Sequence, residues 1–177
     1  LDRRGESTTA VRYRQEAEDL RTAVEGHAWE GDRYIAGTND EGRPFGSKEN
    51  REGSLFLNPQ TWSVISGIAA PDRARKAMET ALAELVKPYG ALLLAPAYQD
   101  VDPYIGYITR YAPGLRENGG VYSHASTWAV QALAMAGRAD EAYALWRGMC
   151  PPLRAHEDAD LYAAEPYVMP GNTDGPD

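Results

Sequence analysis

Residues 124–149, HASTWAVQALAMAGRADEAYALWRGM, predict a pair of helices joined by a tight turn. The first helix is expected over residues 124–136, and Gly137 marks the turn because glycine commonly ends helices. The second helix is expected over residues 139–149 and is stopped by Pro151. The first helix has one apolar face with three- and four-residue spacing, formed by Ala125, Trp128, Ala132 and Met135.

A second hairpin with the same layout lies earlier in the chain. Trp62 near the start of one helix is followed by Pro71 and another helix, just as Trp128 is followed by Gly137 and another helix. Helical hairpins bury little surface alone and must stack, so both an α/α toroid and an α-solenoid fit this repeat. We therefore expect a mainly all-α fold and a single domain over residues 1–177 without an internal boundary.

The other predicted elements follow from local signals. An amphipathic helix is expected from Ser7 to about residue 29, and a hairpin-like patch around a turn at Asn39. Asn58, followed by proline, has the composition of a helix N-cap. Residues 91–122 are rich in proline, glycine and tyrosine, and a loop of this length in a compact domain is usually functional.

Composition excludes several classes of function. The net charge of −8 and the pI of about 4.9 argue against nucleic acid or an anionic membrane as partner, because both need a basic face. The single cysteine, Cys150, provides no disulfide framework and is expected to be a packed side chain. The three histidines form no zinc-binding pair, so no metal site is expected.

Location is predicted from the same composition. No stretch approaches the length of a membrane span, and the N-terminus LDRRGEST lacks the apolar core of a signal peptide. We therefore expect a cytoplasmic protein. Because the chain begins with Leu1 rather than methionine, we also expect it to derive from a longer protein.

The densest polar cluster is RYAPGLRENGGVYSH, residues 110–124, directly before the predicted helix. The N–H groups at the start of a helix favour an anion, so His124 in the first turn could bind phosphate. In the alternative interpretation, Glu117 and Asn118 cap the helix and His124 packs beside Trp128.

Two further segments are candidates for binding. The segment 46–62, GSKENREGSLFLNPQTW, is read either as a binding loop or as a charged loop before a capped helix. In AEPYV, residues 164–168, Glu165 could accept a hydrogen bond from a sugar hydroxyl if buried, but it could equally be a solvated carboxylate.

Three runs resemble one known family. They are GSKENREGSLFLNPQTWSVISGIA (residues 46–69), RYAPGLRENGGVYSHASTWAV (residues 110–130) and AAEPYV (residues 163–168). They resemble, in the same order, the inverting phosphorylases of glycoside hydrolase family 94, which include cellobiose, cellodextrin and chitobiose phosphorylases. The resemblance covers nearly the whole chain and implies the C-terminal part of an (α/α)6-barrel catalytic domain.

The resemblance also implies a reaction. The family phosphorolyses a β-linked glucosyl disaccharide or oligosaccharide, such as cellobiose, reversibly and with inversion to a sugar α-1-phosphate. Its co-substrate is inorganic phosphate, and no cofactor is expected. Phosphate is already an anionic nucleophile, so such an enzyme needs one general acid and a means of holding phosphate in line with the anomeric carbon.

The resemblance assigns roles to four residues. His124 matches the family's phosphate-binding histidine. Arg116 and Glu117 match a segment that borders the acceptor-sugar subsite. Tyr111 matches a position that faces the same subsite and is aromatic in members that accept glucose, so it favours a glucose-type acceptor.

No catalytic residue of this family is expected within the chain. The general acid should be the first Asp of an Asp-Trp-Asn-Asp-like motif upstream, and no such motif occurs here. The isolated chain is therefore expected to be inactive. For the full-length enzyme, a homodimer is left open.

Two other functions remain as alternatives. An (α/α)6-barrel glycoside hydrolase would need a second carboxylate to activate water, and Glu117 and Glu165 are the available positions. A non-catalytic helical-repeat binding module would explain the hairpins but not the polar segment 110–124.

Overall fold

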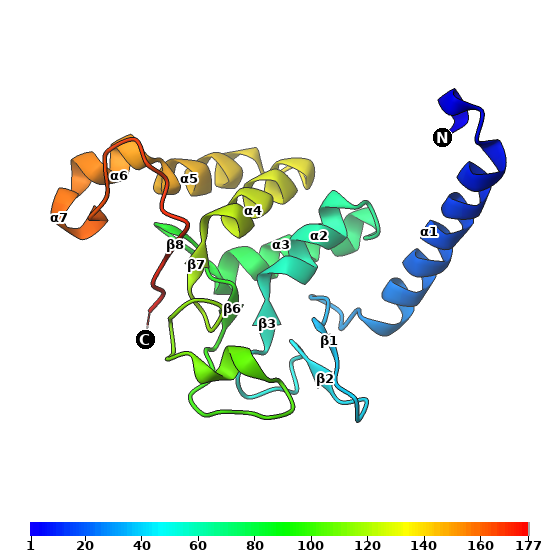
Figure 1. Ribbon diagram of the computed structural model, residues 1–177, viewed down its shortest axis with the longest axis horizontal. Helices are drawn as coiled ribbons and strands as arrows, with labels where there is room; N and C mark the ends of the chain where they lie inside the picture. Colours follow the sequence, from blue (N-terminus) through cyan, green and yellow to red (C-terminus); the bar gives the residue numbers. More distant parts are fainter. Residues whose placement is uncertain (177) are drawn as a thin grey trace.

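The computed structural model describes residues 1–176 and is mainly α-helical, as the sequence predicts (Figure 1). The helices are, in chain order, α1 (Ser7–His27), α2 (Leu57–Ile65), α3 (Pro71–Glu84), α4 (Ser123–Met135), α5 (Ala139–Met149), α6 (Pro151–Glu157) and α7 (Ala159–Tyr162), with 3-10 turns η1 (Asp2–Arg4) and η2 (Tyr107–Arg110).

The strands are short and pair only in twos, all antiparallel. The pairs are β1 (Gly37–Thr38) with β2 (Pro44–Phe45), β3 (Leu55–Phe56) with β6 (Leu94–Ala95), β4 (Val86–Lys87) with β5 (Gly90–Ala91), and β7 (Val121–Tyr122) with β8 (Asn172–Thr173). Two-stranded ribbons of this size have little stability of their own. They fasten loops to the ends of helices instead of forming a layer.

The core lies between two helical hairpins. Helix α2 packs against both α3 and α4, and α4 packs against α5. In α4 the buried positions are mostly alanines, which allow neighbouring helices to approach closely. The largest fully buried apolar side chains, each contributing about 1.5–3 kcal/mol by burial, are Leu55, Leu57, Met78, Leu85, Leu94 and Leu133.

The internal repeat extends into the strands before the helices. Strand β3 leads directly into α2, and strand β7 leads directly into α4. Trp62 and Trp128 then occupy the same position in their helices, and their ring centroids lie 5.2 Å apart. The predicted pair of related hairpins is therefore confirmed, with each unit consisting of a strand followed by two helices.

Helix α1 extends away from the two hairpins (Figure 1). Its predicted apolar stripe is largely exposed in this chain, with Tyr13 at 49% and Leu20 at 60% exposure. Only its C-terminal end is fastened, because Glu25 accepts a hydrogen bond from the hydroxyl of Tyr34 at 2.7 Å and forms an ion pair with Arg73 on α3. Among residues 1–176, no helix is long and apolar enough to cross a membrane.

The structure corrects one of the predicted helix boundaries and extends another. Asn58 is not an N-cap, because α2 already begins at Leu57, whose N–H donates to the carbonyl of Leu93 at 2.9 Å. The pairing of β3 with β6 thus sets the start of the helix, and the Asn-Pro signal falls inside it. Pro151 ends α5 as predicted, but it also occupies the first position of α6, where proline is well tolerated.

The predicted hairpin at Asn39 forms slightly later than expected. Its strands are β1 and β2, and the residues around Tyr34 form only an isolated bridge to Trp29. The turn itself is as predicted, because the Asn39 side-chain oxygen accepts hydrogen bonds from the N–H groups of Glu41 and Arg43.

Candidate functional site

The polar segment predicted from the sequence forms a tight turn next to the start of α4. The N–H of Gly114 donates to the carbonyl of Asn118 at 2.9 Å, and the N–H of Gly120 donates to the carbonyl of Arg116 at 2.9 Å. Arg116 has a φ of 49°, which is unusual for a residue other than glycine. The turn leaves the guanidinium of Arg116 exposed.

Arg116 and Glu117 are held by two tyrosines. The Arg116 guanidinium carbon lies 5.0 Å from the centroid of the Tyr111 ring. The Tyr122 hydroxyl donates to Oε1 of Glu117 at 3.0 Å. Burial raises the pKa of Tyr122, and the hydrogen bond to Glu117 raises it further, while Arg116 acts in the opposite direction. The hydroxyl therefore stays protonated and continues to donate.

The second carboxylate oxygen of Glu117 is the one buried side-chain polar atom without a hydrogen-bond partner among the described residues. The nearest cation, Nε of Arg116, lies 3.7 Å away. Buried polar atoms are rarely left without partners, so this oxygen is an exception among the described residues. The Glu117 side chain as a whole is 39% exposed, so the carboxylate group lies near the surface.

The prediction that Glu117 and Asn118 cap α4 is wrong. The N-cap of α4 is Tyr122, and no side chain caps it. Glu117 bonds to Tyr122 instead, and the side chain of Asn118 is fully buried among loops. Both residues lie too far before Ser123, the first helical residue, because β7 separates the turn from the helix.

His124 lies in the first turn of α4 and is exposed. Its ring contacts Tyr122, with centroids 5.5 Å apart, and Trp128, with centroids 4.9 Å apart. The packing beside Trp128 that the sequence suggested is therefore confirmed. An exposed imidazole held edge to face between two aromatic rings has few orientations and remains open to a ligand.

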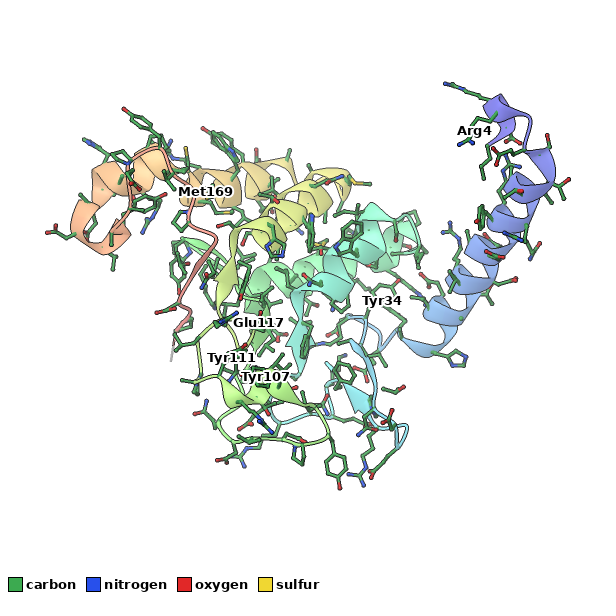
Figure 2. The ribbon with its side chains drawn as sticks, in the orientation of Figure 1. Arg4, Tyr34, Tyr107, Tyr111, Glu117 and Met169 are labelled. Carbon is green, nitrogen blue, oxygen red and sulfur yellow. The ribbon has the colours of Figure 1, made fainter. Side chains whose placement is uncertain are left out.

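Together these side chains form a continuous aromatic and polar surface. The rings of Tyr107 and Tyr111 lie 5.3 Å apart, and the contacts continue through Arg116, Glu117 and Tyr122 to His124, Trp128 and Trp62. Tyr107, Tyr111 and Glu117 lie close together on the loop side of the helices (Figure 2). Flat rings beside carboxylate, guanidinium and imidazole groups suit a sugar, which has apolar faces and a hydroxylated rim.

Three buried polar side chains bond to backbone groups in ways that the sequence did not predict. Asn118 bonds to loop backbone, Gln60 in α2 bonds to the N–H and carbonyl of Tyr34, and Ser126 in α4 bonds to the N–H of Ala91. For Gln60 and Ser126, the available signal was a polar residue on the buried face of a helix. Gln60 shares that face with Leu57, and both residues are fully buried.

The other two predicted segments have structural roles here. Ser47 is fully buried, its hydroxyl donates to Glu30 at 2.6 Å, and its N–H donates to the side chain of Asn50 at 2.9 Å. This matches the charged loop of the alternative interpretation of residues 46–62, whereas the capped helix of that interpretation is wrong because no side chain caps α2. Glu165 is exposed, which matches the interpretation as a solvated carboxylate.

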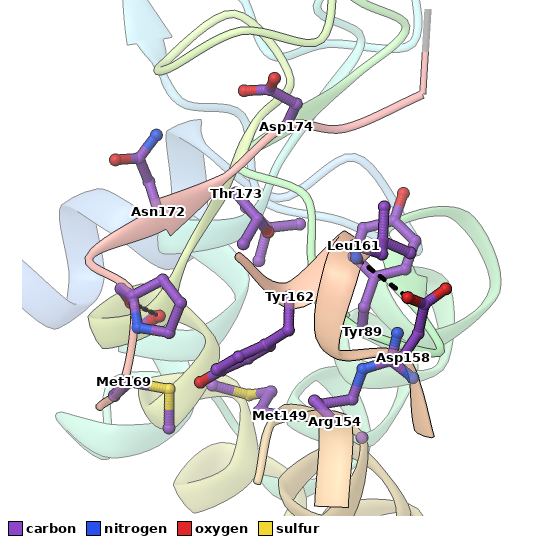
Figure 3. A pocket seen from close by; sticks show the side chains of 14 residues that line it. Tyr89, Met149, Arg154, Asp158, Leu161, Tyr162, Met169, Asn172, Thr173 and Asp174 are labelled. Carbon is purple, nitrogen blue, oxygen red and sulfur yellow. Dashed lines mark hydrogen bonds between the residues drawn. The ribbon is translucent and has the colours of Figure 1, made fainter. Parts of the chain in front are cut away.

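Two hollows lie away from the predicted site residues. One has a volume of about 500 Å³ and lies between α6, α7 and β8, with Arg154, Asp158 and Tyr162 on its wall (Figure 3). Two of its charged groups already have partners, since Arg154 bonds to Glu157 and Asp158 accepts from the N–H of Leu161, and Asp174 also lines the hollow.

The second hollow has a volume of about 580 Å³ and lies between α1 and α2. Neither hollow is lined by His124, Tyr111, Arg116 or Glu117. Within residues 1–176, no group of three or more His, Cys, Asp or Glu side chains could hold a metal ion.

Comparison with known proteins places the chain in a family. Residues 1–177 match the catalytic domain of the glycosyl hydrolase 94 superfamily. The chain is 38% identical over 157 residues to solabiose phosphorylase of Paenibacillus borealis, covering 89% of this chain and 20% of that protein.

Two further relatives are named for different activities. The chain is 40% identical over 161 residues to the cyclic beta-(1,2)-glucan synthase NdvB of Rhizobium meliloti, covering 89% of this chain and 6% of that protein. It is 34% identical over 170 residues to N,N'-diacetylchitobiose phosphorylase of Vibrio furnissii, covering 94% of this chain and 21% of that protein.

The chain thus spans about a fifth or less of the length of these relatives. Its stacked helical hairpins form part of an (α/α)6 barrel, the fold of this family's catalytic domain. The match over the whole chain and the fold agree, and the chain belongs to the glycosyl hydrolase 94 superfamily.

Proposed function

We propose that this chain is part of a glycoside phosphorylase that cleaves a β-linked glucosyl disaccharide or oligosaccharide, such as cellobiose, with inorganic phosphate. The product is a sugar α-1-phosphate formed with inversion, and the reaction is reversible. The proposal rests on the family and on one observation: an exposed histidine in the first turn of α4, whose ring contacts Tyr122, the residue that donates a hydrogen bond to Glu117.

In this proposal, phosphate binds at the start of α4. The first N–H groups of a helix have no partner within the helix and carry a partial positive charge. The N–H of Ser123 is already used by the carbonyl of Gly171 at 3.1 Å. His124, together with the remaining first-turn N–H groups, would hold phosphate oxygens and keep the nucleophile oriented toward the anomeric carbon.

The acceptor sugar would bind at the turn that carries Arg116. The carboxylate of Glu117, whose side chain is 39% exposed, would accept a hydrogen bond from a sugar hydroxyl. The ring of Tyr111, covered on one side by Arg116, would contact the sugar ring. An aromatic residue at position 111 favours a glucose-type acceptor by resemblance to the family.

We also propose that the general acid is supplied by a residue outside residues 1–177. These residues contain no Asp-Trp-Asn-Asp motif. The chain alone would then be inactive, because a positioned general acid contributes about 10²–10⁴-fold in rate. The whole enzyme is proposed to be cytoplasmic and to need no cofactor, and a homodimer is its proposed assembly.

A hydrolase is the second candidate. It would use water as nucleophile and need a base opposite the general acid. Glu117 is occupied on one oxygen by Tyr122, and Glu165 is exposed. Neither carboxylate is therefore marked as that base, and the relatives named as phosphorylases favour the phosphorylase.

The test is to incubate cellobiose with the full-length protein and separately with residues 1–177, each with and without phosphate. The expected result is sugar 1-phosphate from the full-length protein only, and only when phosphate is present. Glucose release that does not need phosphate would establish a hydrolase and refute the role of His124.

A further inference from the structure

The side chain of Asn118 is fully buried and uses its amide on three backbone groups. Its oxygen accepts from the N–H of Tyr98 at 2.8 Å. Its NH₂ group donates to the carbonyl of Tyr98 at 2.8 Å and to the carbonyl of Tyr111 at 2.9 Å. An amide can accept and donate twice in this way, which no other side chain of its size can do.

These bonds join three points of the segment between β6 and β7. Tyr98 lies in the loop after β6, and Tyr111 directly follows η2. Tyr98 is itself only 5% exposed and packs tightly on Gly53, where an added Cβ would lie 2.1 Å from the tyrosine oxygen. The N–H of Gly53 also donates to the carbonyl of Pro96 at 2.7 Å. A second segment, before β3, is therefore held by the same group of contacts.

The three bonds of the Asn118 side chain, called the Asn118 clamp, fix the proposed acceptor residues Tyr111 and Arg116. The Asn118 clamp holds the backbone of Tyr111 directly. Asn118 also closes the turn that carries Arg116, because its N–H donates to the carbonyl of Leu115 at 2.9 Å and its carbonyl accepts from Gly114. The Arg116 guanidinium then lies over the Tyr111 ring.

We propose that Asn118 is a positioning residue for the acceptor sugar, acting through Tyr111 and the Arg116–Glu117 turn. This inference rests on the proposed function, because it names the group that shapes the acceptor side of that site. In this proposal Asn118 does not contact the sugar. It fixes the positions of Tyr111 and of the Arg116–Glu117 turn, which do.

The chain contains a matched control in Gln60. Gln60 is equally buried, accepts from the N–H of Tyr34 at 2.8 Å, and donates to the carbonyls of Tyr34 at 2.8 Å and Phe56 at 3.0 Å. Both amides therefore make three bonds to backbone, but Gln60 holds no proposed acceptor residue. Changing either amide to an acid, Asn118→Asp or Gln60→Glu, removes two donors at nearly constant shape and leaves buried carbonyls unpaired.

The experiment measures synthesis by the full-length protein from α-glucose 1-phosphate and glucose. For Asn118→Asp we expect the KM for glucose to rise by about 10- to 100-fold, because displacement of site residues by about 1 Å has effects of this size. The KM for α-glucose 1-phosphate should stay within about 2-fold. Gln60→Glu should lower stability to a similar extent without a selective rise in the KM for glucose.

Hydrogen exchange provides a readout that does not need activity. In Asn118→Asp, the Tyr98 amide and residues 111–118 should exchange faster, whereas in Gln60→Glu the faster exchange should be confined to the region of Tyr34. Asn118→Ser, which keeps one hydroxyl, serves if the aspartate variant does not fold. It should show the same pattern of exchange.

The outcomes separate the two proposals. Equal changes of both KM values in Asn118→Asp, or unchanged exchange at Tyr98, would overturn the role of Asn118 while leaving the phosphorylase proposal intact. A wild-type protein that forms no disaccharide from these substrates and releases glucose without phosphate refutes the phosphorylase, and with it the acceptor role of Asn118. The selective rise in the KM for glucose supports both.

Discussion

Two glycines in equivalent helix positions should respond to alanine with opposite signs. Gly26 is the penultimate residue of α1, and Gly148 is the penultimate residue of α5. A Cβ added at Gly26 would meet nothing within 4 Å. At Gly148 the same atom would lie 2.1 Å from the carbonyl oxygen of Pro88 and 3.1 Å from its carbonyl carbon.

The magnitudes follow from two opposing effects. Alanine in place of a helical glycine stabilises by about 0.5–1 kcal/mol, because it loses less backbone entropy on folding. Overpacking of this kind typically costs about 1–3 kcal/mol. Pro88 lies in the turn between β4 and β5, where Lys87 pairs with Gly90, so the carbonyl is backbone that cannot rotate away like a side chain. We therefore expect a net loss of about 1–2 kcal/mol for Gly148→Ala.

The assay is urea unfolding followed by far-ultraviolet circular dichroism for the wild type and both variants. Gly26→Ala should raise the free energy of unfolding by about 0.5–1 kcal/mol, which controls for helix propensity. Gly148→Ala should lower it. A Gly148→Ala protein as stable as Gly26→Ala would refute the close approach of α5 to the β4–β5 turn.

The remaining predictions concern phosphate, pH and the attachment of α1. His124→Ala in the full-length enzyme should raise the KM for phosphate far more than that for the disaccharide, and an unchanged KM for phosphate would refute its assignment. Burial, with two nearby carboxylates, raises the pKa of Tyr98 from 10.0 to about 12. The neutral hydroxyl therefore contributes to the free energy of unfolding in full below pH 10. This contribution is lost as the pH rises through 12. Urea titrations should show that loss, on the order of 2 kcal/mol, in the wild type and not in Tyr98→Phe. Arg73→Ala removes the ion pair to Glu25, and hydrogen exchange throughout α1 should become faster while that in α4 stays unchanged.

Helices were the part of the fold that the sequence predicted best. The second hairpin was located to within one residue, because its apolar spacing, Gly137 and Pro151 agree with one another. The start of α2 was misplaced because a strand pairing between β3 and β6, not a capping side chain, determines it. Such a pairing joins residues about 40 positions apart and leaves no local pattern in the sequence.

For the candidate site, the sequence identified the segment but not its internal roles. His124, Arg116 and Glu117 were singled out by their chemistry and by resemblance, and the structure brings them to one surface with Tyr111. Asn118 was read as a cap because its residue type is common there. Its actual bonds go to loop backbone 7 and 20 residues away, which only the folded arrangement determines.

Three buried polar side chains affect how the substrate specificity of such a site can change during evolution. The side chains of Gln60, Ser126 and Asn118 form hydrogen bonds to backbone groups, and not to the side chains, of the loops that they hold. A loop can therefore exchange its side chains, or be transplanted from a relative with a different substrate, and still be anchored in the same place. These three anchoring residues stay the same while the loop side chains change. New substrate specificity can therefore arise in the loops without substitutions in the core.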